Sequence, residues 1–176
     1  LADETIPVSL QVQCLNPESK KERTVLYSQT QSLTLSANSV QTLKIPWTIP
    51  QNAPGFVLLN VLAKESNGLE NLMESGICIA DDNTIRKGQS IRYKDNAFEL
   101  QSPKGETRRV CLWGTDTYGN MFSSPSHSPW SWYRDLQMMQ DYGLHLYENL
   151  QFIPKNHQYT ELQWRQMEAI IQLSQH

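Results

Sequence analysis

The stretch Arg109-Val-Cys-Leu-Trp-Gly-Thr-Asp-Thr-Tyr-Gly-Asn120 predicts a buried strand that opens into a polar and aromatic loop. A helix is predicted over residues 128–143, a second strand over 144–153 and a second helix over 160–176. Two parallel strands cannot bury both faces of a sheet. This order of strand, helix, strand and helix therefore predicts the opening of a larger α/β domain.

Both predicted helices carry signals at their ends. Ser128 suits the N-cap of the first helix, and Gly143 suits its C-terminal cap. Thr160 and Gln163 have the spacing of a capping box at the start of the second. Helical spacing predicts that each helix turns an apolar face toward the sheet: Tyr133, Leu136, Met139 and Tyr142 on the first, and Trp164, Met167, Ile170 and Ile171 on the second. The second helix has no Gly or Pro stop, which favours a chain cut before a third strand.

The first half of the chain has the pattern of a β-structure. Val8, Leu10 and Val12 alternate with polar residues, which is the period of a half-buried strand. Turn signals recur at roughly 8–12-residue spacing up to residue 81, which predicts an antiparallel β-sandwich. Trp47 is expected in its core, with an exposed ligand platform as the alternative.

A polar, turn-like stretch at residues 81–84 separates this sandwich from the second half of the chain. Residues 85–101 then predict a β-hairpin, and a further strand begins near Arg108. We therefore expect two domains, an Ig-like sandwich over residues 1–84 and a hairpin with the strand–helix segment over residues 85–176.

Composition excludes some classes of function. The chain has 176 residues and a net charge of −3, without a Lys/Arg cluster dense enough to follow a phosphate backbone, so no nucleic-acid partner is expected. No apolar run approaches the roughly 20 residues that span a bilayer. The chain begins with Leu and shows no signal peptide, which indicates a mature product, an expressed piece or a fragment.

The cysteines and histidines predict no metal and no cofactor. Cys14 and Cys78 suit either a disulfide between two strands or, together with Cys111, a set of buried thiols. Cys111 is expected to pack inside its strand. The four His residues lack metal-ligand spacing, and no phosphate-binding glycine loop or nucleophile elbow occurs.

Two segments resemble carbohydrate-active enzymes. Residues 33–47 and 54–58 are similar in spacing to the Ig-like modules that precede catalytic domains in many of these enzymes. Residues 110–122 and 132–144 resemble the entry to a (β/α)8-barrel glycoside hydrolase of the β-galactosidase and cellulase-like group. The chain departs from that group where its second strand presents Tyr147-Glu-Asn149, because an Arg often stands there.

The resemblance implies a binding site at the carboxyl ends of the strands, where barrel enzymes bind their ligands. Carboxylate and amide side chains there hydrogen-bond sugar hydroxyls, and an aromatic ring stacks on a sugar face. The residues expected to bind substrate are Asp116, Tyr118 and Asn120, delivered by the first strand, and Glu148 and Asn149, delivered by the second. For Asp116 and Glu148, loop capping and pairing with a basic neighbour are the structural alternatives. In this group the catalytic carboxylates lie on about the fourth and seventh strands, so no catalytic residue is assigned.

The sequence thus predicts the N-terminal portion of a glycoside hydrolase that acts on a polysaccharide or oligosaccharide and is inactive alone. Its expected partners are a carbohydrate ligand and either the remainder of the barrel or a second chain. We expect an extracytoplasmic or secreted location. The alternative is a non-catalytic extracytoplasmic binding or assembly module with an Ig-like sandwich.

Overall fold

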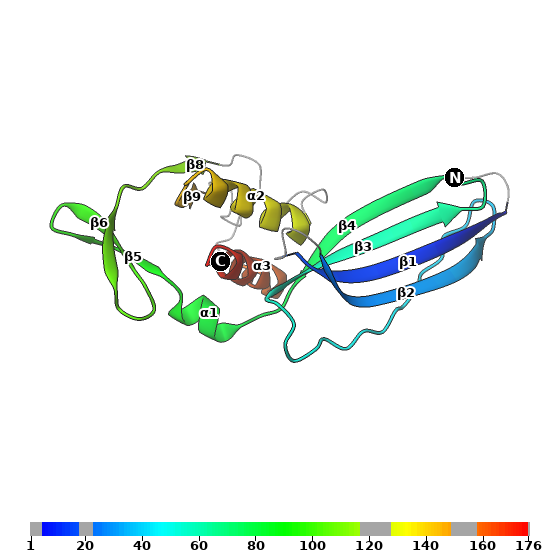
Figure 1. Ribbon diagram of the computed structural model, residues 1–176, viewed down its shortest axis with the longest axis horizontal. Helices are drawn as coiled ribbons and strands as arrows, with labels where there is room; N and C mark the ends of the chain where they lie inside the picture. The colour runs from blue at the N-terminus through cyan, green and yellow to red at the C-terminus, as the bar shows by residue number, and fades with distance from the viewer. Residues whose placement is uncertain (1–4, 18–22, 117–127, 149–157, 176) are drawn as a thin grey trace. The chain divides into compact units, whose positions relative to one another are not determined.

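The computed structural model describes residues 5–17, 23–116, 128–148 and 158–175 (Figure 1). The chain forms two compact units, Leu1–Ile77 and Cys78–His176, and each is described by itself. The division into domains at residues 84 and 85 stays a prediction.

The first unit contains a four-stranded antiparallel sheet. Its strands are β1 (Ile6–Asn16), β2 (Thr24–Leu35), β3 (Phe56–Glu65) and β4 (Glu70–Cys78), in the order β2-β1-β3-β4. Val8 and Val12 of the alternation predicted for β1 are buried, whereas Leu10 is half-buried like its polar neighbours. The buried side chains of β1 and β3 form the core of this sheet: Val8, Val12, Cys14, Leu15, Phe56, Val57 and Leu58. Burial of a side chain as large as Leu58 contributes about 1.5–3 kcal/mol.

Between β2 and β3 the chain runs without forming a strand. Residues 39–50 are extended and follow β2 through two contacts. The Gln41 side-chain amide donates to the Thr34 carbonyl at 3.1 Å, and the rings of Trp47 and Tyr27 lie 6.3 Å apart. Trp47 is half-buried by this contact. The prediction of antiparallel β-structure is thus confirmed, whereas the described residues of this unit form one sheet and no second sheet of a sandwich.

The second unit begins with a short helix, α1 (Asp82–Lys87), where the sequence predicted only a polar turn. Asp81 is its N-cap: the carboxylate accepts from the Thr84 hydroxyl at 2.6 Å and from the backbone N–H of Asn83 at 3.0 Å. These hydrogen bonds, that of Thr84 foremost, lower the pKa of the Asp81 carboxyl. Local capping chemistry therefore turns the polar stretch into a helical turn.

A three-stranded antiparallel sheet follows, with β5 (Ser90–Lys94), β6 (Ala97–Gln101) and β7 (Thr107–Val110) in chain order. The predicted hairpin is confirmed. Its two-residue turn places Asp95 and Asn96 at φ values of 50° and 58°, the left-handed pair that a type I′ turn requires.

The predicted order of strand, helix, strand and helix is also confirmed, as β8 (Gly114–Asp116), α2 (Pro129–Asp141), β9 (Leu146–Glu148) and α3 (Glu161–Leu173). β8 and β9 pair in parallel. The capping box of Thr160 and Gln163 is present. Among the described residues, β8 and β9 are the one pair of parallel strands. They do not close into a barrel.

Three details of this segment differ from the sequence prediction. The apolar run after Arg109 is divided between antiparallel β7 and parallel β8, so that Cys111 and Trp113 lie between strands and are exposed. On α2, Tyr142 is 77% exposed and Trp132 is buried instead. On α3, Trp164 and Ile171 are exposed, while Ile170 and Leu173 are buried.

The end of α3 binds the start of the second unit through two glutamine side chains. Gln172, only 2% exposed, donates from Nε2 to the carbonyl of Ile79 at 2.7 Å and accepts at Oε1 from the N–H of Asp81 at 2.8 Å. One turn on, Gln175 accepts from the N–H of Gln89 at 2.6 Å. The side-chain amide of Gln172 thus provides hydrogen-bond partners for one backbone N–H and one backbone carbonyl, as a neighbouring β-strand would.

Candidate functional site

The two predicted acidic site residues are register partners. β8 and β9 pair Gly114 with Leu146 and Asp116 with Glu148, and the two acids are the last residues of their strands. Neighbouring strands lie about 4.8 Å apart, so the backbone brings these positions together at the carboxyl end of the pair. The structure describes the backbone at both positions, whereas Tyr118, Asn120 and Asn149 lie outside the described residues.

The amino end of the same strand pair is held by backbone contacts. The carbonyl of Trp113 accepts from the N–H of His145 at 2.6 Å and from the N–H of Leu146 at 3.2 Å. Gly114 permits this approach, because a Cβ there would collide with the carbonyl oxygen and the Cβ of Leu146. The strand register that places Asp116 beside Glu148 therefore depends on a glycine two residues earlier.

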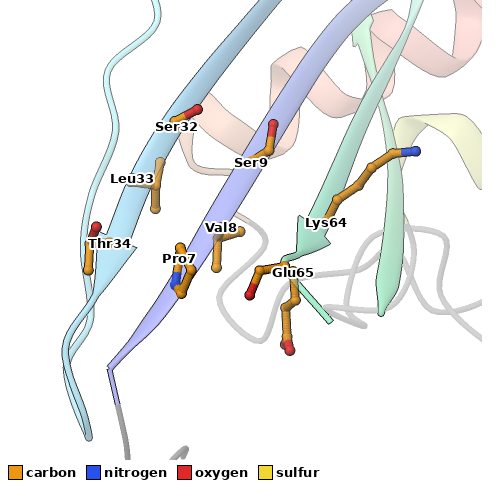
Figure 2. Close-up of a pocket in the computed structure, with 9 residues that line it drawn as sticks. Pro7, Val8, Ser9, Ser32, Leu33, Thr34, Lys64 and Glu65 are labelled. Atoms are coloured by element: carbon orange, nitrogen blue, oxygen red, sulfur yellow. The ribbon is translucent and has the colours of Figure 1, made fainter. Parts of the chain in front are cut away.

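One hollow of about 380 Å³ lies on the four-stranded sheet (Figure 2). Three neighbouring strands and the residue after β3 line it: Pro7, Val8, Ser9, Ser32, Leu33, Thr34, Lys64, Glu65 and Ser66. Ser9 is the register partner of both Ser32 and Lys64, and these three side chains project to the same side in Figure 2. The Lys64 ammonium is paired with the Glu70 carboxylate at 2.6 Å. The polar groups around the hollow are hydroxyls, the Glu65 carboxylate and the paired Lys64 ammonium.

A second hollow of about 400 Å³ lies on the three-stranded sheet, lined by Gln89, Leu100, Ser102, Glu106, Thr107 and Arg108. Neither hollow is lined by a predicted site residue. The predicted site residues that the structure describes, Asp116 and Glu148, therefore lie at the ends of β8 and β9 and not in either hollow.

Groups with a shifted pKa also lie away from the strand ends. Burial raises the pKa of the Cys78 thiol to about 11 and raises that of Cys14 as well. Both are free thiols, so the disulfide alternative does not hold, and Cys111 is a free and exposed thiol. Cys14 and Cys78 pack as small apolar side chains, and a protonated thiol is a poor nucleophile.

Among the described residues, no three His, Cys, Asp or Glu side chains are grouped so as to hold a metal ion. In the same part of the chain, no helix has the length and apolarity needed to cross a membrane. A comparison of the sequence with protein-family models finds no match, and a search among curated proteins finds none either.

Proposed function

We propose that the chain is the N-terminal portion of a glycoside hydrolase that acts on a polysaccharide or oligosaccharide. The observation that carries this proposal is the register of Asp116 with Glu148 at the carboxyl ends of two parallel strands joined through α2. In a (β/α)8 barrel, this edge is where ligands bind. The finer architecture that we propose is an Ig-like sandwich followed by the first strands of such a barrel.

In this proposal the strand ends bind substrate and do not cleave it. Asp116 and Glu148 accept hydrogen bonds from sugar hydroxyls, with Tyr118, Asn120 and Asn149 completing the surface. Retaining glycosidases use a catalytic pair of carboxylates about 5–5.5 Å apart. We assign binding because the resemblance to barrel hydrolases places the catalytic pair on later strands. The portion is therefore inactive until the remainder of the barrel, or a second chain, completes it.

The test uses a longer form of the protein that carries the further strands, assayed on a panel of aryl glycosides. Asp116→Asn and Glu148→Gln each remove a charged acceptor, and a hydrogen bond to a charged group is worth about 1.5–3 kcal/mol. We expect kcat/KM to fall about 10- to 100-fold with an unchanged melting temperature. Asp141→Asn is the matched control, since Asp141 is an exposed carboxylate at the end of α2.

Two outcomes would contradict the proposal. If a longer form hydrolyses no glycoside, the proposed hydrolase function is wrong. If the parent hydrolyses glycosides and both variants have unchanged kinetics, Asp116 and Glu148 do not bind the sugar.

The alternative is a non-catalytic extracytoplasmic binding or assembly module. The edge strand β4 favours it, because Leu72 and Met73 are exposed there and unpaired strand edges bind other chains. A reading frame that stops after His176, together with a monomeric and cooperative melt of this chain, would select the module over the hydrolase. Either function is proposed for an extracytoplasmic or secreted protein.

A further inference from the structure

The strand β2 forms one edge of the four-stranded sheet, and the sequence at its centre reads the same in both directions (Figure 1). The residues from Ser28 to Ser32 are Ser-Gln-Thr-Gln-Ser, a palindrome centred on Thr30. The two serines and Thr30 are exposed, whereas Gln29 and Gln31 are half-buried. In the described part of the chain β2 has β1 as its one neighbouring strand, so its other side is an open edge.

The direction of the backbone groups along this edge follows from Thr34. Its carbonyl accepts from the Gln41 side chain at 3.1 Å, and its register partner in β1 is Pro7, which has no N–H to donate. The N–H and carbonyl of Thr34 therefore point away from β1. In an antiparallel strand this direction alternates from residue to residue, and the register with β1 runs without a shift through the palindrome. The backbone groups of Thr30 and of the two serines consequently point to the open edge.

The composition of β2 does not oppose a further strand. Edge strands are commonly protected from pairing by charged residues or by Pro. The whole of β2 contains neither. The other edge strand, β4, carries two acids, and two copies of β4 paired about Leu72 would set Glu70 opposite Glu74. Of the two edges, β2 is therefore the one suited to pairing with its own copy.

The extended residues 39–50 contact β2 on either side of the palindrome and not within it. The Gln41 side chain binds the carbonyl of Thr34, and the Trp47 ring lies 6.3 Å from that of Tyr27. Residues 39–50 form no strand, so their backbone does not replace a neighbouring strand along β2. The centre of the edge is thus left exposed between these two contacts.

We propose that two copies of this chain pair their β2 strands in antiparallel orientation about a twofold axis through Thr30. Thr30 then lies opposite Thr30 of the second copy. Ser28 lies opposite Ser32, and Gln29 lies opposite Gln31, so each residue of the palindrome meets its own kind. A twofold interface requires such a self-complementary surface. The proposal uses the first unit alone and is independent of the hydrolase.

The pairing provides partners for the outward backbone groups. Residues with outward groups meet as hydrogen-bonded pairs, and each pair exchanges two N–H···O=C bonds. Small hydroxyl side chains lie opposite one another on one face, and such Thr and Ser pairs stabilise a sheet. On the other face the amide of Gln29 meets that of Gln31, and an amide both donates and accepts hydrogen bonds. No charge is brought beside a like charge along the paired residues.

The length of the paired segment predicts a weak dimer. At about 3.4 Å per residue, the palindrome covers about 17 Å of strand. This edge buries much less than the roughly 800 Å² per partner of a stable interface, and small interfaces belong to transient complexes. We therefore expect a reversible dimer with a Kd between about 10 μM and 1 mM.

The test is sedimentation velocity of the 176-residue chain. Between about 5 μM and about 1 mM, the sedimentation coefficient is expected to rise from that of a monomer toward that of a dimer. Thr30→Lys places two like charges opposite each other and is expected to raise the Kd at least about 10-fold. Asn71→Lys is the matched control, because Asn71 is exposed on the other edge strand, and it should leave the Kd unchanged.

A mixture of two variants tests the position of the axis. Thr30→Glu also repels its own copy, whereas an equimolar mixture of Thr30→Lys and Thr30→Glu is expected to associate. The pairing about Thr30 brings the two opposite charges together, since it sets this residue against itself. If Thr30→Lys does not fold, Ser28→Lys mixed with Ser32→Glu tests the same register.

Three results would overturn the proposal. The first is a parent chain that stays monomeric over the whole concentration range. The second is a mixture of folded variants, checked by circular dichroism, that does not associate. The third is a dimer that Asn71→Lys weakens and Thr30→Lys does not, because the interface would then lie on β4.

Discussion

Gly114 sets how closely the two parallel strands approach. It is the register partner of Leu146, and a Cβ at position 114 would meet backbone atoms of Leu146 that cannot move aside. The sequence predicted a buried strand that opens into a loop here, and the structure places Gly114 at the start of β8. Glycine is therefore needed at position 114 because it has no side chain to collide with Leu146, and not because of an unusual backbone conformation.

Gly114→Ala is expected to separate β8 from β9 and to lower the free energy of unfolding by about 1–3 kcal/mol, as overpacking does. Denaturant unfolding followed by circular dichroism measures the change. Gly143→Asn is the control: its Cβ meets nothing within 4 Å, and Asn tolerates the φ of 71° at that position. A Gly114→Ala protein with the stability of the parent would show that the two strands do not depend on this contact.

At the level of elements, local chemistry was predictable and packing was not. The capping box at the start of α3 and the hairpin that turns at Asp95 and Asn96 involve residues close together in the sequence, which displays them directly. The inward face of a helix depends on what covers it. Helical spacing alone therefore placed Tyr142 and Trp164 inside, although both are exposed.

The strand after Arg109 shows a second limit of prediction. A continuous apolar run such as Val110-Cys-Leu-Trp113 fits a buried strand, because the pattern does not reveal where one strand ends and another begins. The structure ends β7 at Val110, which pairs with Phe98, and starts β8 at Gly114. Strand partners, which lie far apart in sequence, decide such a division.

The candidate site was predictable in part for the same reason. The sequence indicated that two predicted strands deliver Asp116 and Glu148, and in a barrel the carboxyl ends of the strands form the ligand-binding edge. Their pairing as register partners required the parallel ladder of β8 and β9. Tyr118, Asn120 and Asn149 stay predictions, since they lie outside the described residues.

The contact between α3 and the start of the second unit gives a prediction for an element. Gln172→Ala removes the side chain that satisfies the carbonyl of Ile79 and the N–H of Asp81. Each buried group left without a partner costs about 1–3 kcal/mol, so we expect the free energy of unfolding to fall by about 2–4 kcal/mol. Glu168→Ala, at an exposed position of the same helix, is expected to stay within about 0.5 kcal/mol of the parent.

Denaturant unfolding compares the two variants, and amide exchange of Asp81 locates the effect. If Gln172→Ala were as stable as Glu168→Ala, water would have to replace the glutamine amide at both backbone groups. The sequence did not reveal this role, because a glutamine within an apolar helix face looks like an interruption of the pattern.

At the scale of the whole molecule, the order of elements was predictable and their closure was not. The predicted sandwich appears as one antiparallel sheet beside an extended segment, and the predicted barrel entry appears as two parallel strands with two helices. Closing a sandwich or a barrel requires pairing between segments distant in sequence, which local patterns do not specify. The proposed hydrolase therefore requires further strands beside β8 and β9.

The three cysteines provide a test that reaches both compact units. Cys14 lies in β1, Cys78 is the last residue of β4, and Cys111 follows β7 in the second unit. Cys111 is exposed, whereas burial raises the pKa of Cys14 and brings that of Cys78 to about 11. Because the thiolate is the reactive form, Cys78 stays protonated and slow at about pH 8.

We expect one thiol of the native protein to react rapidly with a disulfide reagent, and Cys111→Ser to abolish that fast reaction. The other two thiols should react only as the parts that bury them open, so their rates compare the opening of β1 with that of the end of β4. Equal slow rates would indicate that these two parts of the sheet open together, and unequal rates that they open separately. A fast reaction of Cys14 in the native protein would contradict its burial, and with it the core of β1 on which the four-stranded sheet depends.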